Sequence, residues 1–478
     1  MVASREPTID EEAKVKDVAS ELVDSDSEVA LSTGDINYRN VGWIKCAGLL
    51  FSEYICLAIM SFPGSYAALG LVPGLIVTAF IAAAVCYTGF IITDYCIANP
   101  GITSVNDIGK RLFWNSKVVW WLTAACFICN NTLIQALHVL TGAEYFNTIS
   151  DNQIMPGRNV CSVVFGVVSM IACFLLSIPR TFSHMSYLGY FSALTMFVAV
   201  ILSIIFAGVE DYPNGYTPSE PIQWDVVAPT GSPFYTGVLP VLNITYTLAG
   251  QVTYPSFISQ MRRPQDFKKA LVLVTVLELI LFCLAGSIVY VYVGNEYMAA
   301  PAFGVLSSVY KKISFSFALP TLLFLGSLYS NVSAQFLFEQ IFGLKSKHHN
   351  NHTLLGWSTW LALNGGLWII AFVIAEVIPF FSDLLSLMSS LFDCWFGFIF
   401  WGVAYFRLRK IKHPELSGYE NFKQSNLWNK LQYGICWFLI GVGFFLLGPG
   451  TYSTVQSIIK SYQNNLYGKP FACASNGL

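Results

Sequence analysis

Apolar segments of about 20 residues recur along nearly the whole chain, separated by short polar stretches. A helix of that length crosses the ~30 Å hydrocarbon core of a bilayer. The pattern predicts an all-α polytopic membrane protein with about eleven transmembrane helices. Their expected positions are 44–68, 74–97, 118–140, 159–178, 186–208, 234–258, 270–293, 313–341, 355–376, 380–405 and 431–448.

The two ends of the chain are polar. Residues 1–40 are acidic and lack periodicity, which predicts a disordered tail. They show no basic segment followed by an apolar segment and a cleavage site, so they do not resemble a signal peptide. We therefore expect three parts: a tail at 1–40, a membrane domain at 41–450 and a C-terminal tail at 451–478.

Two of the expected spans contain helix-breaking residues at mid-membrane depth. The first carries SFPGS at 61–65, and the sixth carries polar residues around Gly250, between Pro240 and Pro255. One such break is typical of a kinked packing helix. Two breaks five spans apart favour two five-helix repeats of opposite topology, with a substrate site where the interrupted helices meet.

Composition and loop charge agree with this interpretation. Hydrophobic residues make up 55% of the chain and charged residues 11%, and the mean hydropathy is +0.57; soluble domains are about one quarter charged. Basic residues concentrate in the expected loops at 110–117, 262–269, 345–347 and 407–430. By the positive-inside rule the N-terminus is cytoplasmic and the C-terminus is outside.

Several classes of function lack their signatures. The twelve cysteines mostly fall inside spans, where they pack as small apolar residues. We find no nucleotide-binding loop, no metal-ligand cluster and no nucleophile paired with a base, so we expect no cofactor, no metal, no enzymatic activity and no nucleic-acid partner. A channel would need repeated polar rings. A secondary transporter fits best, and a transporter-like sensor is the alternative because its site would look the same.

Ionisable residues inside spans are costly and are candidates for carrying a coupling ion. Glu53 is the first candidate and Asp393 the second, while Glu278 alternatively faces a neighbouring polar side chain. His138 is expected at the membrane interface. Ser330 and Ser333 offer hydroxyls suited either to sodium or to ordinary hydrogen bonds between helices.

Two stretches carry a family resemblance. LLFSEYICLAIMSFPGSYAALGLVPG at 49–74 resembles the first helix of the amino acid/auxin permease family, in particular its fungal neutral amino acid permeases. YTLAGQVTYPSFISQMRRPQDFKKAL at 246–271 is similar to the sixth helix of that family. Two departures are Gly64, where a small serine is usual, and Gln251, where histidine is frequent.

The resemblance implies a LeuT-type fold. Helices 1–5 (about 44–208) and 6–10 (about 234–405) would be inverted repeats, with the eleventh helix (431–448) peripheral. It also implies import of neutral amino acids by proton symport, with sodium coupling through Ser330 and Ser333 as the alternative. We expect a monomer in the plasma membrane, with the vacuolar membrane as the other possibility.

The resemblance also implies a binding site. The substrate carboxylate would lie at Ser61, Phe62, Pro63, Gly64 and Ser65. The rest of the substrate would be lined by Tyr246, Thr247, Leu248, Ala249, Gly250 and Gln251. Tyr246 is the aromatic residue expected to close over the ligand. The small residues Gly64, Ala249 and Gly250 would leave room for a bulky aliphatic or aromatic side chain.

Overall fold

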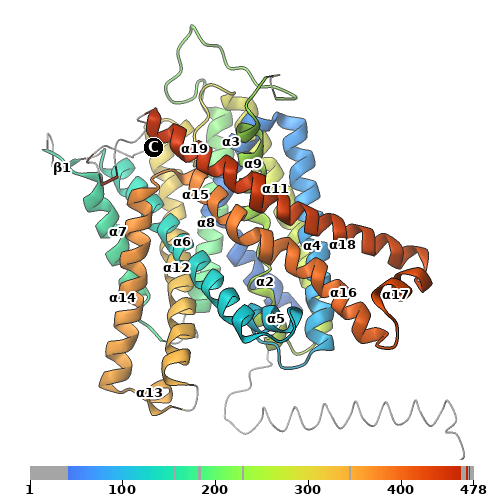
Figure 1. Cartoon of the computed structure of the whole chain (residues 1–478). Coiled ribbons are helices and arrows are strands. Elements are labelled where there is room, and N and C mark those ends of the chain that lie inside the picture. The colour runs from blue at the N-terminus through green and yellow to red at the C-terminus, as the bar shows by residue number, and fades with distance from the viewer. Residues whose placement is uncertain are drawn as a thin grey trace, which may run out of the picture.

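The computed structural model describes residues 41–151, 153–155, 158–180, 185–228, 231–343, 346–464, 470–471 and 473. Over this part of the chain the architecture is a helical bundle (Figure 1). A short hairpin, β1 (Gln153–Met155) and β2 (Arg158–Asn159), is paired antiparallel. The expected N-terminal tail at 1–40 lies outside the described residues.

The first half of the bundle contains seven α-helices. They are α2 (Trp43–Tyr54), α3 (Phe62–Leu69), α4 (Leu71–Ala98), α5 (Val105–Leu112), α6 (Lys117–Ser150), α7 (Ser162–Leu176) and α8 (Met185–Val209), with the 3-10 turn η1 (Leu57–Ser61) between α2 and α3.

The second half begins with another interrupted helix. Its elements are α9 (Phe234–Leu248), α10 (Tyr254–Gln260), η2 (Pro264–Asp266), α11 (Phe267–Val293), η3 (Ala302–Val305), α12 (Ser308–Phe342), α13 (Lys347–Asn350), α14 (Leu354–Val377), α15 (Phe381–Met388), α16 (Phe400–Lys412), α17 (Gly418–Gln424), α18 (Leu427–Phe445) and α19 (Thr451–Gln463). The π-helical segments η4 (Ser389–Ile399) and η5 (Leu446–Gly450) join α15 to α16 and α18 to α19.

The polytopic all-α class is confirmed. Among the described residues, eight helical runs are long and apolar enough to cross a membrane, and the pair around η1, bent by 48°, makes nine. The expected spans at 159–178 and 234–258 correspond to the 15-residue α7 and to the interrupted pair α9–α10. The count of eleven therefore stays a prediction.

Two predicted boundaries were wrong. Helix α6 continues to Ser150 instead of ending at 140. The last helix continues past 448 to Gln463, so the first part of the predicted tail at 451–478 is helical. The π-helical segment η5 accommodates Pro449, whose missing N–H would interrupt an ordinary helix. Beyond it, Ser453 and Thr454 are buried because α19 packs on α9 and α15.

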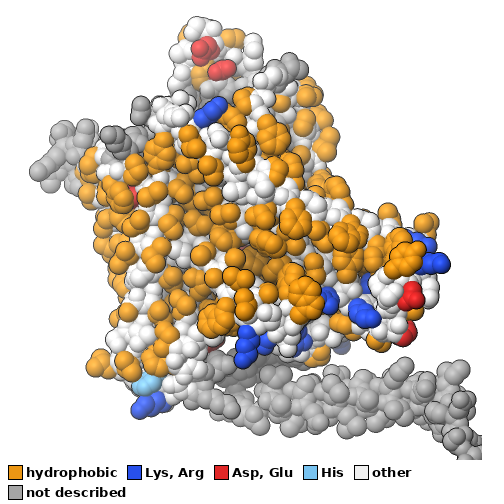
Figure 2. Space-filling view, in the orientation of Figure 1, with side chains coloured by type: hydrophobic (Ala, Val, Ile, Leu, Met, Phe, Trp, Pro, Cys, Tyr) orange, Lys and Arg blue, Asp and Glu red, His pale blue; other side chains and the backbone are white. Residues whose placement is uncertain are grey.

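The interrupted helices lie in the interior of the bundle. Helix α11 contacts α2, α3, α4 and α8, and α12 contacts α6 and α8. Helices α13 and α14 lie on one side of the view in Figure 1, and α16, α17 and α18 lie on the other. The outer surface is largely apolar (Figure 2), as at Ile76 and Trp437, which are 63% and 64% exposed. Exposed apolar residues at this density are typical of lipid-facing helices.

The long loop between α8 and α9 is fixed to the turn between α3 and α4. The Ala228 N–H donates to the Leu69 carbonyl (3.0 Å), and the Val72 N–H donates to the Val226 carbonyl (3.0 Å). Gly70 between them has φ +84°, and a Cβ there would lie 2.5 Å from the Val227 Cα. Only glycine combines a positive φ with the absence of a Cβ that would clash, so Gly70 determines where the loop contacts the turn.

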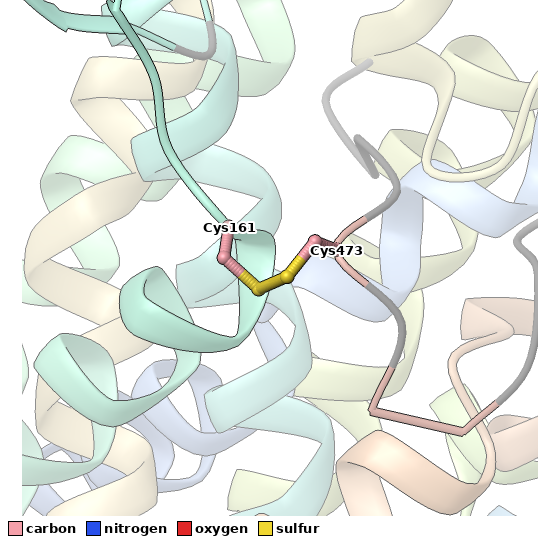
Figure 3. The surroundings of a disulfide bond; sticks show 2 residues. All are labelled: Cys161 and Cys473. Atoms are coloured by element: carbon pink, nitrogen blue, oxygen red, sulfur yellow. A yellow bond between two sulfur atoms is a disulfide. The ribbon is translucent and has the colours of Figure 1, made fainter.

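A disulfide bond joins Cys161, just before α7, to Cys473 near the C-terminus (Figure 3). The two cysteines are 312 residues apart in sequence. Close by, the ring of Phe471 contacts that of Phe372 on α14. Sequence analysis treated the cysteines mainly as packing residues and did not find this pair, because spacing along the chain gives no signal for so distant a contact.

We predict that Gly286→Ala destabilises the bundle. A Cβ at Gly286 on α11 would lie 2.6 Å from the buried ring of Tyr66, which is held by a 2.9 Å hydrogen bond with Thr78. Overpacking of this kind costs about 1–3 kcal/mol. Thermal unfolding of the purified protein in detergent should show a lower midpoint. The matched control is Gly366→Ala, where nothing lies within 4 Å of the added Cβ. Equal midpoints for the two variants would contradict the packing argument.

Candidate functional site

The first helix is interrupted at Ile55 and Cys56. Helix α2 ends at Tyr54, Ile55 and Cys56 leave helical geometry (ψ 79° and 174°), and the 3-10 turn η1 follows. The expected break at 61–65 was therefore placed too late. Pro63 lies in the first turn of α3, where a missing N–H costs nothing because it has no partner within the helix. Glu53 thus lies beside the break and not ten residues before it.

Residues 61–65 cover the end of η1 and the start of α3, and all of them except Gly64 are buried. The Ser61 hydroxyl donates to the Ala58 carbonyl (2.7 Å), and the Ser65 hydroxyl donates to the Ser61 carbonyl (2.9 Å). The ring of Phe62 packs on Phe282 of α11. The nearest atoms to a Cβ at Gly64 belong to Met298, Ala299 and Ala300, in the segment before η3. Both hydroxyls are thus used within the helix itself.

The second break lies where it was predicted. Helix α9 ends at Leu248, residues 249–253 form a turn, and α10 begins at Tyr254 with Pro255 in its first turn. Thr247 and Leu248 are buried, and the Thr247 hydroxyl donates to the Asn243 carbonyl (2.9 Å).

Glu53 connects the two breaks. Its Oε2 accepts a hydrogen bond from the Thr253 hydroxyl (3.0 Å), and its Oε1 accepts one from the Tyr329 hydroxyl on α12 (3.0 Å). The Thr253 hydroxyl also lies 2.9 Å from the Gly250 carbonyl, and its single proton serves one of these acceptors at a time. One carboxyl group therefore contacts both interrupted helices and α12.

A tyrosine pair lies beside this contact. The hydroxyls of Tyr54 and Tyr254, the residues that follow Glu53 and Thr253 in sequence, are hydrogen-bonded to each other. Glu278 on α11 is only 3% exposed, and its Oε1 has no hydrogen-bond partner among the described residues. It interacts electrostatically with Glu53 and Tyr54. The predicted candidates Glu53 and Glu278 therefore belong to one cluster.

Gln251 and Asp393 meet at the π-helical segment η4. The Gln251 Nε2 donates to the Thr88 hydroxyl (3.1 Å) and to the Gly397 carbonyl (3.4 Å). A Cβ at Gly397 would lie 3.8 Å from the Asp393 Cβ and 3.9 Å from Gln251. Asp393 is 7% exposed, and its Oδ2 lacks a partner among the described residues. π-helical turns are frequent at functional sites because they redirect side chains of this kind.

Tyr246 lies between the two groups of acidic residues. It lies near Asp393 and Cys56, and Tyr329 lies near both Tyr246 and Glu53. Its side chain is partly exposed, and its hydroxyl forms no hydrogen bond with another described residue. Tyr246 is therefore the residue of this region whose hydroxyl is available to a ligand.

The room expected at Gly250 is filled. A Cβ there would lie 2.2 Å from the Tyr54 hydroxyl oxygen, so the tyrosine side chain occupies the space that the missing side chain leaves. The lack of a side chain at Gly250 lets the two breaks contact each other and does not leave an open cavity. Ala249 lies beside it and is partly exposed.

The other predicted residues lie away from the breaks. The Ser330 hydroxyl donates to Asn364 on α14 (2.9 Å), and Ser333 accepts from Asn131 on α6 (3.0 Å). These are hydrogen bonds between helices, the alternative that the sequence left open. His138 is buried and lies in the middle of α6, not near its end, because α6 extends ten residues further than expected.

Sequence analysis missed several residues of the site. Thr253, Tyr329 and Thr88 supply hydrogen bonds that single positions do not reveal, because their partners are far away in the chain. Tyr54 and Tyr254 could have been predicted from the sequence, because each directly follows a polar residue at a break. Glu144 was missed because it follows the predicted end of α6, yet it is 3% exposed.

Comparison with known protein families shows to which family this sequence is related. A sequence model of the transmembrane amino acid transporter protein family matches residues 39–446, which include both breaks and all the acidic residues of the cluster. The chain belongs to the transmembrane amino acid transporter family. It is therefore a multi-pass membrane protein of a transporter family, as the resemblance implied.

Three proteins from fungi and a plant are similar over most of the chain. The N amino acid transport system protein of Neurospora crassa is 32% identical over 453 residues, covering 94% of this chain and 92% of its own. A transmembrane transporter of Gibberella moniliformis is 26% identical over 92% of this chain and 89% of its own. Auxin transporter-like protein 2 of Oryza sativa is 21% identical over 90% of this chain and 86% of its own.

We predict that Gly250→Val reduces amino acid uptake by about tenfold or more at equal membrane abundance. The added side chain would displace Tyr54 and its bond to Tyr254; overpacking costs about 1–3 kcal/mol, and about 1.4 kcal/mol is a factor of ten. Initial uptake rates should be normalised to protein in the membrane. Gly237→Val, in the same helix α9 but with nothing within 4 Å of the Cβ, should transport normally. A similar loss in both variants would contradict the assignment.

Proposed function

We propose that this protein imports neutral amino acids by proton symport, with Glu53 as the proton carrier. The observation that carries the proposal is the position of Glu53, whose carboxyl oxygens contact Thr253 at the second break and Tyr329 on α12. A proton on this carboxyl changes hydrogen bonds at both interrupted helices at once. That is the connection which coupling an ion to a conformational change requires.

The hydrogen bonds suggest how protonation is transmitted. A charged Glu53 accepts from both Thr253 and Tyr329. When the proton is on Oε2, Glu53 donates to the Thr253 oxygen, and the Thr253 hydroxyl then donates to the Gly250 carbonyl at 2.9 Å. The proton state of one side chain thus alters the polar backbone at the second break, beside Tyr246. Asp393, at the opposite side of Tyr246, is the second carrier candidate.

The cargo follows from the charges around the breaks. Three acidic side chains, Glu53, Glu278 and Asp393, lie in this region, and no basic side chain is among their electrostatic partners in the described part of the chain. A second carboxylate on the substrate would be repelled. The aromatic side chains of Tyr246 and Tyr329 favour aliphatic or aromatic substrates. The N amino acid transport system protein of Neurospora crassa, similar over most of the chain, agrees with an amino acid substrate.

Residues 61–65, Tyr246 and residues 247–251 remain our proposed substrate contacts. For the carboxylate end we favour the backbone around η1 and the start of α3, since freed N–H groups and a helix N-terminus attract anions. The five-plus-five inverted repeat is part of the same proposal. It is supported by four spans (α4, α6, α7 and α8) that separate the two interrupted helices.

We also propose the orientation and location that loop charge indicates: N-terminus in the cytoplasm, C-terminus outside, as a monomer in the plasma membrane. The disulfide supports the orientation, since Cys161 and Cys473 both fall on the side proposed as extracytoplasmic, where disulfides persist.

We predict that Glu53→Gln abolishes proton-driven accumulation. The amide cannot release a proton, so an inward pH gradient across proteoliposomes should no longer concentrate a radiolabelled neutral amino acid, while exchange of labelled for unlabelled substrate continues. Glu376→Gln is the matched control, because it removes an equal charge on α14, a helix that packs on α6, α7 and α12.

The same assay separates the alternatives. Accumulation driven by sodium alone, and lost in Ser330→Ala with Ser333→Ala, would replace the proton with sodium. Substrate binding without accumulation under either gradient would identify a sensor. Full accumulation by Glu53→Gln would remove this residue from the mechanism.

We predict that aliphatic and aromatic amino acids compete for uptake and that glutamate and aspartate do not. The physical reason is the absence of a basic partner for a second carboxylate among the described residues of the cluster. Competition should be measured as the reduction of labelled neutral amino acid uptake by a hundredfold excess of each unlabelled amino acid. Strong competition by glutamate would contradict the proposed cargo, and strong competition by lysine would show that the acidic cluster binds a cationic side chain.

A further inference from the structure

A polar pocket lies at one end of the bundle, outside the residues that connect the interrupted helices. A pocket of about 240 Å³ is enclosed by the ends of α4, α11, α16 and the start of α18. By loop charge this end of the bundle is the cytoplasmic one. None of the residues that line it takes part in the site described above, so the transport mechanism gives the pocket no role.

The charged lining of the pocket is mainly basic. Lys268, Arg409 and Lys412 face one acid, Asp94. The Lys268 ammonium pairs with Asp94 at 2.5 Å, which neutralises that acid. Lys412 is exposed and has no hydrogen-bond or ion-pair partner among the described residues. Two positive charges are thus left without an acidic partner in the pocket.

Arg409 is held in place by polar neighbours that carry no charge. Its Nη2 donates to Asn421 (2.7 Å) and to Ser425 (2.8 Å) around α17. Its Nε is buried and has no acceptor among the described residues. The guanidinium is therefore fixed in position while its charge has no acidic partner in the pocket, an arrangement suited to binding an oxyanion.

The remaining wall is amphipathic. Phe90, Ile91 and Leu408 give it an apolar part, while Tyr87, Asn429 and Gln432 add hydrogen-bonding groups. Outside the pocket, Ile411 and Leu431 are 47% and 54% exposed on the lipid-facing surface. Figure 2 shows basic side chains around the α16–α17 end of the molecule next to a broad hydrophobic surface. Positive charge thus meets the apolar belt at one edge.

We propose that this pocket binds the headgroup of an anionic phospholipid from the cytoplasmic leaflet. The phosphate would lie between Arg409 and Lys412, and the start of the acyl chains would follow the apolar surface past Ile411. Basic pockets between transmembrane helices on this side are suited to such headgroups. A soluble phosphate shares the charge but leaves the apolar wall unused, which is why we favour the lipid.

The test uses the full-length protein purified in detergent. Its thermal unfolding midpoint is followed while dioctanoyl phosphatidylserine, dioctanoyl phosphatidylcholine or inorganic phosphate is added, because a ligand that binds the folded state raises the midpoint. The expected result is a saturable rise with phosphatidylserine and little or none with the other two. An equal rise with phosphatidylcholine would overturn headgroup recognition, and an equal rise with phosphate would make the pocket a site for a soluble anion.

Two variants locate the binding. Lys412→Gln removes one unpaired charge, and Gln432→Glu adds a negative charge while keeping the oxygen that accepts from Tyr405 (3.2 Å). Each should weaken the apparent affinity for phosphatidylserine about fivefold, the effect of one charge near a membrane surface.

The matched controls are Lys423→Gln and Gln424→Glu, which make the same charge changes on exposed positions of α17 outside the pocket lining. They should leave the affinity unchanged. Equal weakening in the controls would show that general surface charge attracts the lipid, which would overturn the pocket as its site.

Discussion

Backbone groups without a partner are costly in a hydrocarbon environment, and the rest of this structure depends on how two interrupted helices meet that constraint. The breaks at Ile55–Cys56 and at 249–253 are placed against each other instead of against lipid. Glu53 contacts Thr253, Tyr54 contacts Tyr254, and Gly250 allows the close approach of Tyr54. Beside the start of α2 and the end of α10, Val41 and Met261 form a β-bridge that joins the two interrupted helices again.

The strength of these contacts is compatible with movement. Hydrogen bonds between transmembrane helices contribute on average about 0.6 kcal/mol each. The bonds from Thr253 and Tyr329 to Glu53 together with the tyrosine pair then contribute roughly 2 kcal/mol, a factor of about thirty in population. Such a set is strong enough to favour one arrangement of the breaks and weak enough for a ligand of moderate affinity to reverse it. Packing of α11 and α12 around them supplies the rigidity.

Features that depend on neighbouring residues could be predicted from the sequence, whereas features that depend on contacts between distant residues could not. The apolar character of the segments and the Gly250 break are local signals; the break was located correctly, while two of the segments extend further than predicted. The first break was misplaced because Pro63 is an obvious helix breaker, whereas in the first turn of α3 it is a residue that a helix accepts. The true interruption at Ile55 and Cys56 involves ordinary apolar residues. The segment η1 that follows them contacts α9, α11 and α12, and no single stretch of sequence encodes such contacts.

The same reasoning explains the unpredicted parts of the site. Ser330 looked like an ion ligand because its neighbours are polar, but its side chain faces Asn364, and Tyr329, one residue earlier, reaches Glu53. Adjacent residues in a helix point about 100° apart. Assigning a side chain to one face or the other therefore requires knowing how α12 is rotated in the bundle, and packing determines that rotation.

The disulfide between Cys161 and Cys473 gives the polypeptide the topology of a closed ring attached to an open thread. Everything from α7 to α19, including the loop between α8 and α9, lies within the ring, and the helices before it form the thread. A protease that cuts that loop once opens the ring without dividing the molecule. The two pieces stay covalently joined until a reductant reaches the sulfurs, so under oxidising conditions the cut adds one water to the molecule but releases no fragment.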